Sequence, residues 1–253
     1  MYAIKKKFGF RDAPNAGFLA CPLTPFYPAG SAARRLKYAL AYTSSLSHRR
    51  RAEGLAGGHL SVAREFGAEF DVLAEKLVSG EALTPWKPSA YLRWRYRGCP
   101  GRSYRTLRLD GPDGLRGAIV LRGPEGPERT AWIVDLLADP GDTATVAALI
   151  RGARRELQAR RASVVWMPAT SARVRAQLLR AGFLETPRSL RFTYLAYAKL
   201  PFDPTEVEWN FYYGDGDCEL YSDRTSTIAA EAQPFHTPSQ EEDLAEIALL
   251  EQA

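Results

Sequence analysis

Leu178-Leu179-Arg180-Ala181-Gly182-Phe183 ends a basic, amphipathic segment with a helix stop signal. Glycine takes the left-handed conformation that closes a helix, and the apolar residue after it folds back onto the last turn. A shorter version of the signal, Lys6-Lys7-Phe8-Gly9-Phe10, stands near the N-terminus. Alone, such a signal marks only the end of a helix. Here it closes an ordered series of strands and helices, which makes it informative about the fold.

Three strands are expected upstream of this signal, separated by strong turns. Gly111-Pro112-Asp113-Gly114 and Gly123–Gly126 have the composition of tight turns between alternating or apolar runs. The third run is almost entirely apolar, as expected of a central strand that is buried on both faces. The expected strands are Ser103–Leu109, Leu115–Leu121 and Ala131–Ala138.

The remainder of the series alternates between helices and strands. Asp142 or Thr143 caps a helix that runs to about Arg161, and its apolar residues recur at helical spacing. The resulting order, β-β-β-α-β-α-β, predicts an α/β (α+β) fold with a mixed sheet and helices on both faces. The later elements are a strand at Val164–Met167, a helix from Ser171 to Gly182 and a strand at Arg191–Leu200.

The residues before this series differ from it in composition. Residues 1–30 are Pro-rich and contain one expected strand around Gly17–Cys21, followed by a linker. Helices are expected over residues 31–52 and Phe70–Leu77. We therefore divide the chain into residues 1–30, a main domain at 31–210, and an acidic tail at 221–253.

Charge is distributed unevenly along the 253 residues. The net charge is +5, but the tail carries −6, which leaves +11 for residues 1–220. A basic body attracts phosphates, anionic cofactors or nucleic acid, although arginine also serves simply as a solubilising surface residue. The tail is either loose and solvated or folds on the basic body or on a partner.

Cysteine usage and hydropathy exclude several classes of protein. The three cysteines, Cys21, Cys99 and Cys218, are far apart and suit neither a disulfide framework nor a zinc site. No apolar run is long enough to predict a membrane span, and no apolar segment follows the basic N-terminus as in a signal peptide. We therefore expect a cytoplasmic protein with no membrane span and no metal site.

The order of elements resembles the GNAT superfamily, the acetyl-coenzyme A dependent N-acetyltransferases, over roughly residues 60–200. Two phrases are similar to segments of GNAT-like proteins: Tyr91-Leu92-Arg93-Trp94-Arg95-Tyr96 with Pro100 and Tyr104, and Trp209 with Gly214-Asp215-Gly216-Asp217. Some members contain two GNAT-like repeats in tandem. Phe8-Gly9-Phe10-Arg11 resembles the end of a first repeat, so residues 1–30 are interpreted as a remnant of one.

The resemblance implies an acyltransferase that moves an acyl group from acetyl-CoA or another acyl-CoA to an amine of a small molecule, sugar or peptide. Backbone N–H groups at the start of the helix near residue 143 would hold the pyrophosphate, because helix N-termini bind anions. Asp135, in the central strand, would take the proton from the amine. The residues implied are Asp135 and Tyr194 for catalysis, and Leu137, Gly141, Thr143 and Ala144 for cofactor binding.

Several positions depart from the family pattern. Asp139 and Asp142 place two carboxylates where phosphates would bind, and Pro140 lacks an N–H donor. Leu178 stands where many members have the tyrosine that protonates the leaving thiolate. The alternative function is therefore a degenerate, non-catalytic GNAT-like module that packs against a partner or a complete repeat, as a homodimer or with another protein. It would expose an apolar surface near residues 1–30.

Two further features leave alternatives open. In Arg93–Arg97, arginines alternate with aromatic residues that could stack on a nucleotide. In the alternative interpretation, Trp94 and Tyr96 anchor the segment to the core while its arginines point outward. Asp215 and Asp217 either bind a hard cation or form a turn. RNA or nucleotide binding through the basic faces, which include the arginines between 151 and 161, ranks last among the function hypotheses.

Overall fold

The computed structural model describes residues 7–26, 31–49, 58–196, 200, 202–204 and 206–216, without the side chains of residue 34 and residues 47–49. The acidic tail lies outside these residues. The strands are β1 (Arg11–Asp12), β2 (Ala16–Pro22), β3 (His59–Ala63), β4 (Tyr104–Gly111), β5 (Gly114–Glu125), β6 (Thr130–Leu137), β7 (Val164–Ala169), β8 (Leu184–Leu190) and β9 (Thr193–Tyr194). The helices are α2 (Ala32–Arg49), α3 (Ala68–Val78), α4 (Ser89–Leu92), the π-helix η1 (Arg93–Arg97), α5 (Thr143–Ala159), α6 (Ala172–Arg180) and the 3-10 helix η2 (Tyr213–Asp215).

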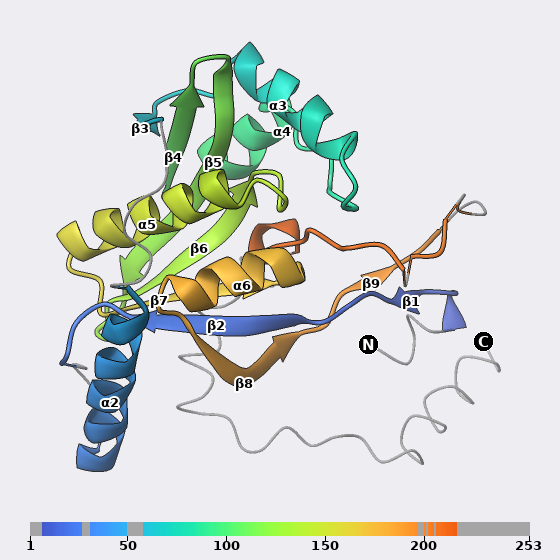
Figure 1. Cartoon of the computed structure of the whole chain (residues 1–253). Coiled ribbons are helices and arrows are strands. Elements are labelled where there is room, and N and C mark those ends of the chain that lie inside the picture. The colour runs from blue at the N-terminus through green and yellow to red at the C-terminus, as the bar shows by residue number, and fades with distance from the viewer. Residues whose placement is uncertain are drawn as a thin grey trace. The chain divides into compact units, whose positions relative to one another are not determined.

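Seven strands form one mixed sheet in the order β3-β4-β5-β6-β7-β2-β8 (Figure 1). Neighbouring strands are antiparallel except β6 and β7, which are parallel and are connected through α5. β1 and β9 make a separate two-stranded sheet. The predicted mixed sheet and α/β class are confirmed.

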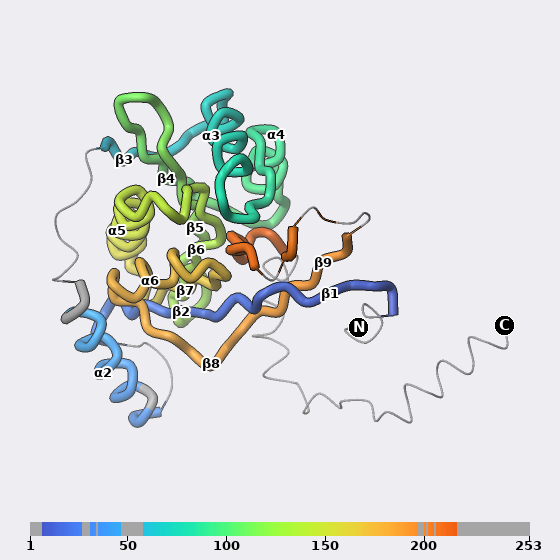
Figure 2. Tube along the Cα trace, turned by 45° about the vertical axis from the view of Figure 1, so that its right-hand side comes forward, coloured from blue at the N-terminus to red at the C-terminus, as the bar shows by residue number. Residues whose placement is uncertain are grey.

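Helices cover both faces of the sheet, as predicted. Successive residues of β5 show why: Ile119 and Leu121 are buried with the apolar side of α5, whereas Ala118 and Val120 are buried with α3 and α4. In the turned view of Figure 2, α5 lies to the left of β4 and β5, and α3 and α4 lie to their right. None of the described helices combines the length and hydropathy that crossing a bilayer requires.

β2 lies next to the edge strand β8, although it precedes the other strands of this sheet in the chain. It lies between β7 and β8 and pairs antiparallel with both. Its strand prediction at Gly17–Cys21 is confirmed, and the strand shares the sheet of the domain that follows it. Phe8 and Phe26, in the described part of residues 1–30, are 71% and 82% exposed.

The last strand prediction was wrong in position. The chain enters β8 directly after Phe183, whereas only Thr193 and Tyr194 of the predicted Arg191–Leu200 form a strand, β9. β8 has mostly exposed side chains and contains Pro187, so its sequence lacks the apolar alternation of a strand. An edge strand tolerates both features, because one side of its backbone has no partner. β3, at the opposite edge, was missed for the same reason.

β6 and β7 diverge partway along their length. They pair only over three residues, from Thr130 to Trp132 in β6. Beyond this point Val120 pairs with Asp135 and Leu121 with Ile133, which leaves Val134 as an extra residue in a β-bulge. Such a bulge bends a strand and redirects its side chains. The divergence leaves space at the centre of the sheet, and the bulge lies beside it.

Candidate functional site

Asp135 lies in the bulge of β6 and is 1% exposed. One of its oxygens, Oδ1, accepts a hydrogen bond from Lys87 Nζ at 2.7 Å and another from the N–H of Leu136 at 2.9 Å. The other oxygen, Oδ2, accepts one from the hydroxyl of Tyr96 at 2.7 Å. Both carboxylate oxygens are therefore engaged by the chain itself.

Lys87 joins Asp135 to a second buried carboxylate. Its Nζ also lies 2.7 Å from Oδ1 of Asp215, and both side chains are 4% exposed. The Oδ2 atom of Asp215 accepts a hydrogen bond from the N–H of Tyr212 at 2.8 Å, which fixes η2. We call Lys87, Tyr96, Asp135 and Asp215 the buried charge network.

The network holds one cation between two carboxyl groups. Burial lowers the pKa of Lys87, but Asp135 and Asp215 outweigh burial and raise it overall, so the amine stays protonated. Burial raises the pKa of Asp215 to about 6, despite the opposing effect of Lys87. A protonated Lys87 is no base, and its role is to compensate the carboxylates, since an unpaired buried charge is costly.

Tyr96 belongs to η1, in which arginines alternate with aromatic residues. The side chains that η1 buries differ from those predicted. Tyr96 is buried and reaches the network, but Trp94 is 68% exposed and does not anchor the segment. Arg95, predicted to point outward, is 6% exposed, and its Nε donates to the carbonyl of Gly214 at 3.3 Å. The π-helical turn explains the difference, because its wider spacing shifts which residues face the core.

The chain itself fills the space where β6 and β7 diverge. Residue Ala169 at the end of β7 forms a bridge with Tyr212, and the N–H of Phe211 donates to Thr170 Oγ1 at 2.8 Å. Gly214 approaches the other strand so closely that a Cβ there would lie 3.0 Å from the carbonyl oxygen of Val134. Tyr213 stacks on Trp132 with ring centroids 5.1 Å apart. We call residues 209–215 the plug segment; it ends in the orange helix η2 beside β6 (Figure 1).

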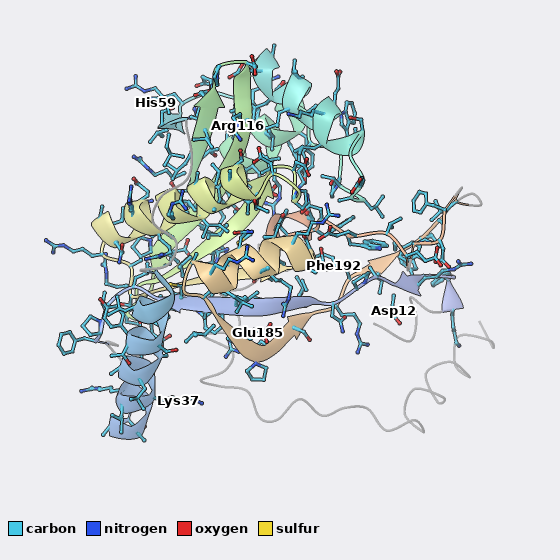
Figure 3. The ribbon with its side chains drawn as sticks, viewed as in Figure 1. Asp12, Lys37, His59, Arg116, Glu185 and Phe192 are labelled. Carbon is cyan, nitrogen blue, oxygen red and sulfur yellow. The ribbon has the colours of Figure 1, made fainter. Side chains whose placement is uncertain are left out.

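The start of α5, where the resemblance places a pyrophosphate, is occupied by carboxylates. Asp139 Oδ1 accepts from the N–H of Gly141 at 2.8 Å, and Asp142 Oδ1 accepts from the N–H of Thr145 at 3.0 Å. Asp142 also pairs at 2.8 Å with Arg116 of β5, which is labelled in Figure 3. Burial raises the pKa of Asp142, but its bonds to Thr145 and Arg116 lower it overall, so the carboxylate stays charged.

The start of α6 is closed in the same way. Ser171 Oγ accepts from the N–H of Val174 at 3.2 Å and donates to the carboxylate of Glu208, which also accepts from the N–H of Arg173 at 3.2 Å. Glu208 directly precedes the plug segment. The N-termini of α5 and α6 thus each hold a carboxylate of the chain.

The other implied site residues lie in different surroundings. Tyr194 is on β9, where its ring packs on Trp209 with centroids 5.2 Å apart, and no hydrogen bond among the described residues joins it to Asp135. Leu137 is buried in the core on the α3 side. Gly141 and Thr143 are exposed and Ala144 is half-buried at the start of α5. Leu178, in place of a tyrosine, is completely buried in the core on the α5 side.

Sequence reasoning missed two members of the network. Lys87 stands between Pro85 and Pro88 in what reads as a loop, and nothing local marks it as buried. The sequence leaves Asp215 as a turn residue or a cation ligand; in the structure it ends the 3-10 helix η2 and pairs with Lys87, while Asp217 is outside the described residues. Within the described part of the chain, no group of His, Cys, Asp and Glu side chains has the arrangement of a metal site.

Comparison with known proteins adds little. No protein-family model matches the chain, and no curated protein matches it. Among solved structures, the chain is similar to L-PGS from Bacillus licheniformis, with 13% sequence identity and a TM-score of 0.34. The matched region covers 66% of this chain and 48% of that one, so the chain matches about half the length of that protein.

Proposed function

We propose that this chain is a degenerate, GNAT-like module that acts by binding rather than by acyl transfer. The observation that carries the proposal is the plug segment, which fills the divergence of β6 and β7 where an acyl-pantetheine arm would have to lie. A second copy of the fold, a complete repeat or another protein is the kind of partner expected for such a module.

Two further observations support this proposal. Asp135 has no free carboxylate oxygen and is 1% exposed, so an amine would have to displace Lys87 or Tyr96 to reach it. The helix N-termini at α5 and α6 hold Asp142 and Glu208, which repel phosphates by roughly a kcal/mol or more per close pair.

Calorimetric titration of the full chain with acetyl-CoA tests the proposal, together with an assay for thiol release in the presence of amines. We expect no thiol release and no saturable binding in the divergence. The variant R64A/R160A serves as a control, because it removes surface arginines that could attract the phosphates of CoA elsewhere. Saturable binding that persists in this variant, with turnover that Asp135→Asn abolishes, would instead establish an acyltransferase.

A further inference from the structure

A pocket of about 450 Å³ opens at the edge of the sheet, where β3 ends beside β4. β3 pairs with β4 only as far as Ala63 and Thr106, and the chain then turns away toward α3. The part of β4 that continues beyond this pairing forms the floor of the pocket. Its volume falls within the range of roughly 300–1,000 Å³ that is typical of small-molecule sites.

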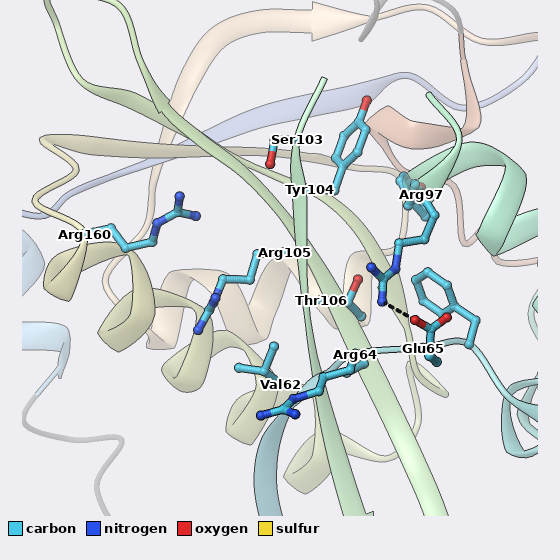
Figure 4. A pocket seen from close by; sticks show the side chains of 12 residues that line it. Val62, Arg64, Glu65, Arg97, Ser103, Tyr104, Arg105, Thr106 and Arg160 are labelled. Atoms are coloured by element: carbon cyan, nitrogen blue, oxygen red, sulfur yellow. Dashed lines mark hydrogen bonds and ion pairs between the residues drawn. The ribbon is translucent and has the colours of Figure 1, made fainter. Parts of the chain in front are cut away.

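Four arginines from separate parts of the chain line this pocket: Arg64, Arg97, Arg105 and Arg160 (Figure 4). They come from the segment after β3, from η1, from β4 and from the end of α5. Glu65 is the one carboxylate among the lining residues. Elements distant in sequence thus bring positive charge to one stretch of the surface, along which the four guanidinium groups are spread (Figure 4).

The four guanidinium groups are incompletely neutralised. Arg97 pairs with Glu65 at 3.1 Å, but these side chains are 48% and 79% exposed, so the pair is weak. Arg105 pairs with Glu156 at 2.6 Å. Within the described ranges, Arg64 and Arg160 have no carboxylate partner. An anion in the pocket would therefore meet guanidinium groups that have no carboxylate partner within the described ranges, and would compete with Glu65 for Arg97.

The other lining groups suit a phosphate ester more than a simple carboxylate. Ser103 and Thr106 contribute hydroxyl groups, which donate to phosphate oxygens. The rings of Tyr96 and Tyr104, with centroids 5.1 Å apart, form one wall. Arginine forks bind phosphate oxygens in pairs, and several forks around one pocket match a ligand with oxygens on more than one phosphorus.

We propose that this pocket binds a small molecule that carries a diphosphate group. Either inorganic pyrophosphate or a nucleoside diphosphate supplies this chemistry. The proposal does not depend on whether acyl transfer occurs, because the arginines that carry it lie outside the buried charge network, with which the pocket shares only the wall residue Tyr96.

Calorimetric titration of the full chain with pyrophosphate, ADP, orthophosphate and a single-stranded RNA oligomer tests the proposal. We expect saturable binding of pyrophosphate or ADP, weaker binding of orthophosphate, and roughly tenfold or greater loss of affinity in R64A/R160A. Tighter binding of ADP than of pyrophosphate would identify a nucleotide ligand, and equal binding the inorganic ion. R155A/R180A is the matched control, because it removes two exposed arginines that do not line the pocket and should change affinity by less than about twofold.

Three outcomes would overturn the proposal. One is the absence of saturable binding for both diphosphates. Another is an equal loss of affinity in R64A/R160A and R155A/R180A, which would indicate attraction by net charge alone. The third is binding confined to a single-stranded RNA oligomer, with a steep dependence on salt. Circular dichroism of both variants checks that folding is retained, as expected for exposed side chains.

Discussion

Lys87 Nζ lies 2.7 Å from Asp215 Oδ1, and this ion pair joins the loop before α4 to η2 at the end of the described chain. The same amine contacts Asp135 in β6, so one buried cation ties three distant segments together. The contact fixes the plug segment against the sheet. The network thus has a structural role in holding the plug segment where β6 and β7 diverge.

Replacing Lys87 by methionine is expected to destabilise the protein by about 3–5 kcal/mol, because it leaves two buried carboxyl groups without their cation. Urea denaturation measures the free energy of unfolding. Lys76→Met is the control: Lys76 is exposed on α3, and its loss should cost no more than about 0.5 kcal/mol. Similar midpoints for the two variants would show that the network contributes little to stability.

Stability should depend on pH through Asp215. Its pKa is raised by burial to about 6 from an ordinary value of 3.8, so between these values the folded protein holds a proton that the unfolded chain releases. The free energy of unfolding therefore falls as pH rises from about 4 to about 6, on the order of 2–3 kcal/mol from this group. Asp215→Asn should lack this contribution. Parallel pH profiles for the wild type and the variant would contradict the assignment.

Tyr96→Phe removes the hydroxyl that donates to Asp135 while keeping the ring. We expect a loss of about 1.5–3 kcal/mol, the range for a hydrogen bond to a charged group. Tyr91→Phe is the matched control, since the Tyr91 hydroxyl makes no hydrogen bond among the described residues. Thermal and urea unfolding of both variants compare them directly, and equal stabilities would argue against a structural role for this hydrogen bond.

Ser171→Ala tests the closed start of α6. The serine hydroxyl caps the helix at Val174 and donates to Glu208, so we expect a loss of about 1–2 kcal/mol. Ser103→Ala provides the comparison, because Ser103 is exposed and makes no hydrogen bond within the described segments. Urea denaturation measures the free energy of unfolding of both variants. Equal values for the two would show that the cap is dispensable.

Local sequence patterns predicted the helices and strands that build the core, but not the edge strands or the long-range contacts of the buried charge network. β5, β6 and α5 have apolar runs or helical periodicity because their faces are buried, and these elements were found. β3 and β8 lie at edges, where exposure removes the pattern. Lys87 stands between prolines and Asp215 between glycines, so both read as loop residues, and they become buried only because the chain returns to β6. Such long-range pairing leaves no local signal.

Gly214→Ala is the sharpest test of the plug segment. A Cβ at this position would lie 2.3 Å from the Tyr96 hydroxyl and 3.0 Å from the carbonyl oxygen of Val134, so a methyl group must displace the network or the strand. We expect a loss of about 1–3 kcal/mol by overpacking. Gly216→Ala adds the same methyl group two residues later, where the nearest atom, in Phe192, is 3.9 Å away, and should be nearly neutral. Urea unfolding of the two variants measures the difference. If Gly214→Ala were as stable as Gly216→Ala, the plug segment would accommodate the methyl group without a loss in the free energy of unfolding. The close fit that fills the divergence of β6 and β7 would then offer no barrier to a ligand, and the argument for a binding module over a catalyst would lose its main support.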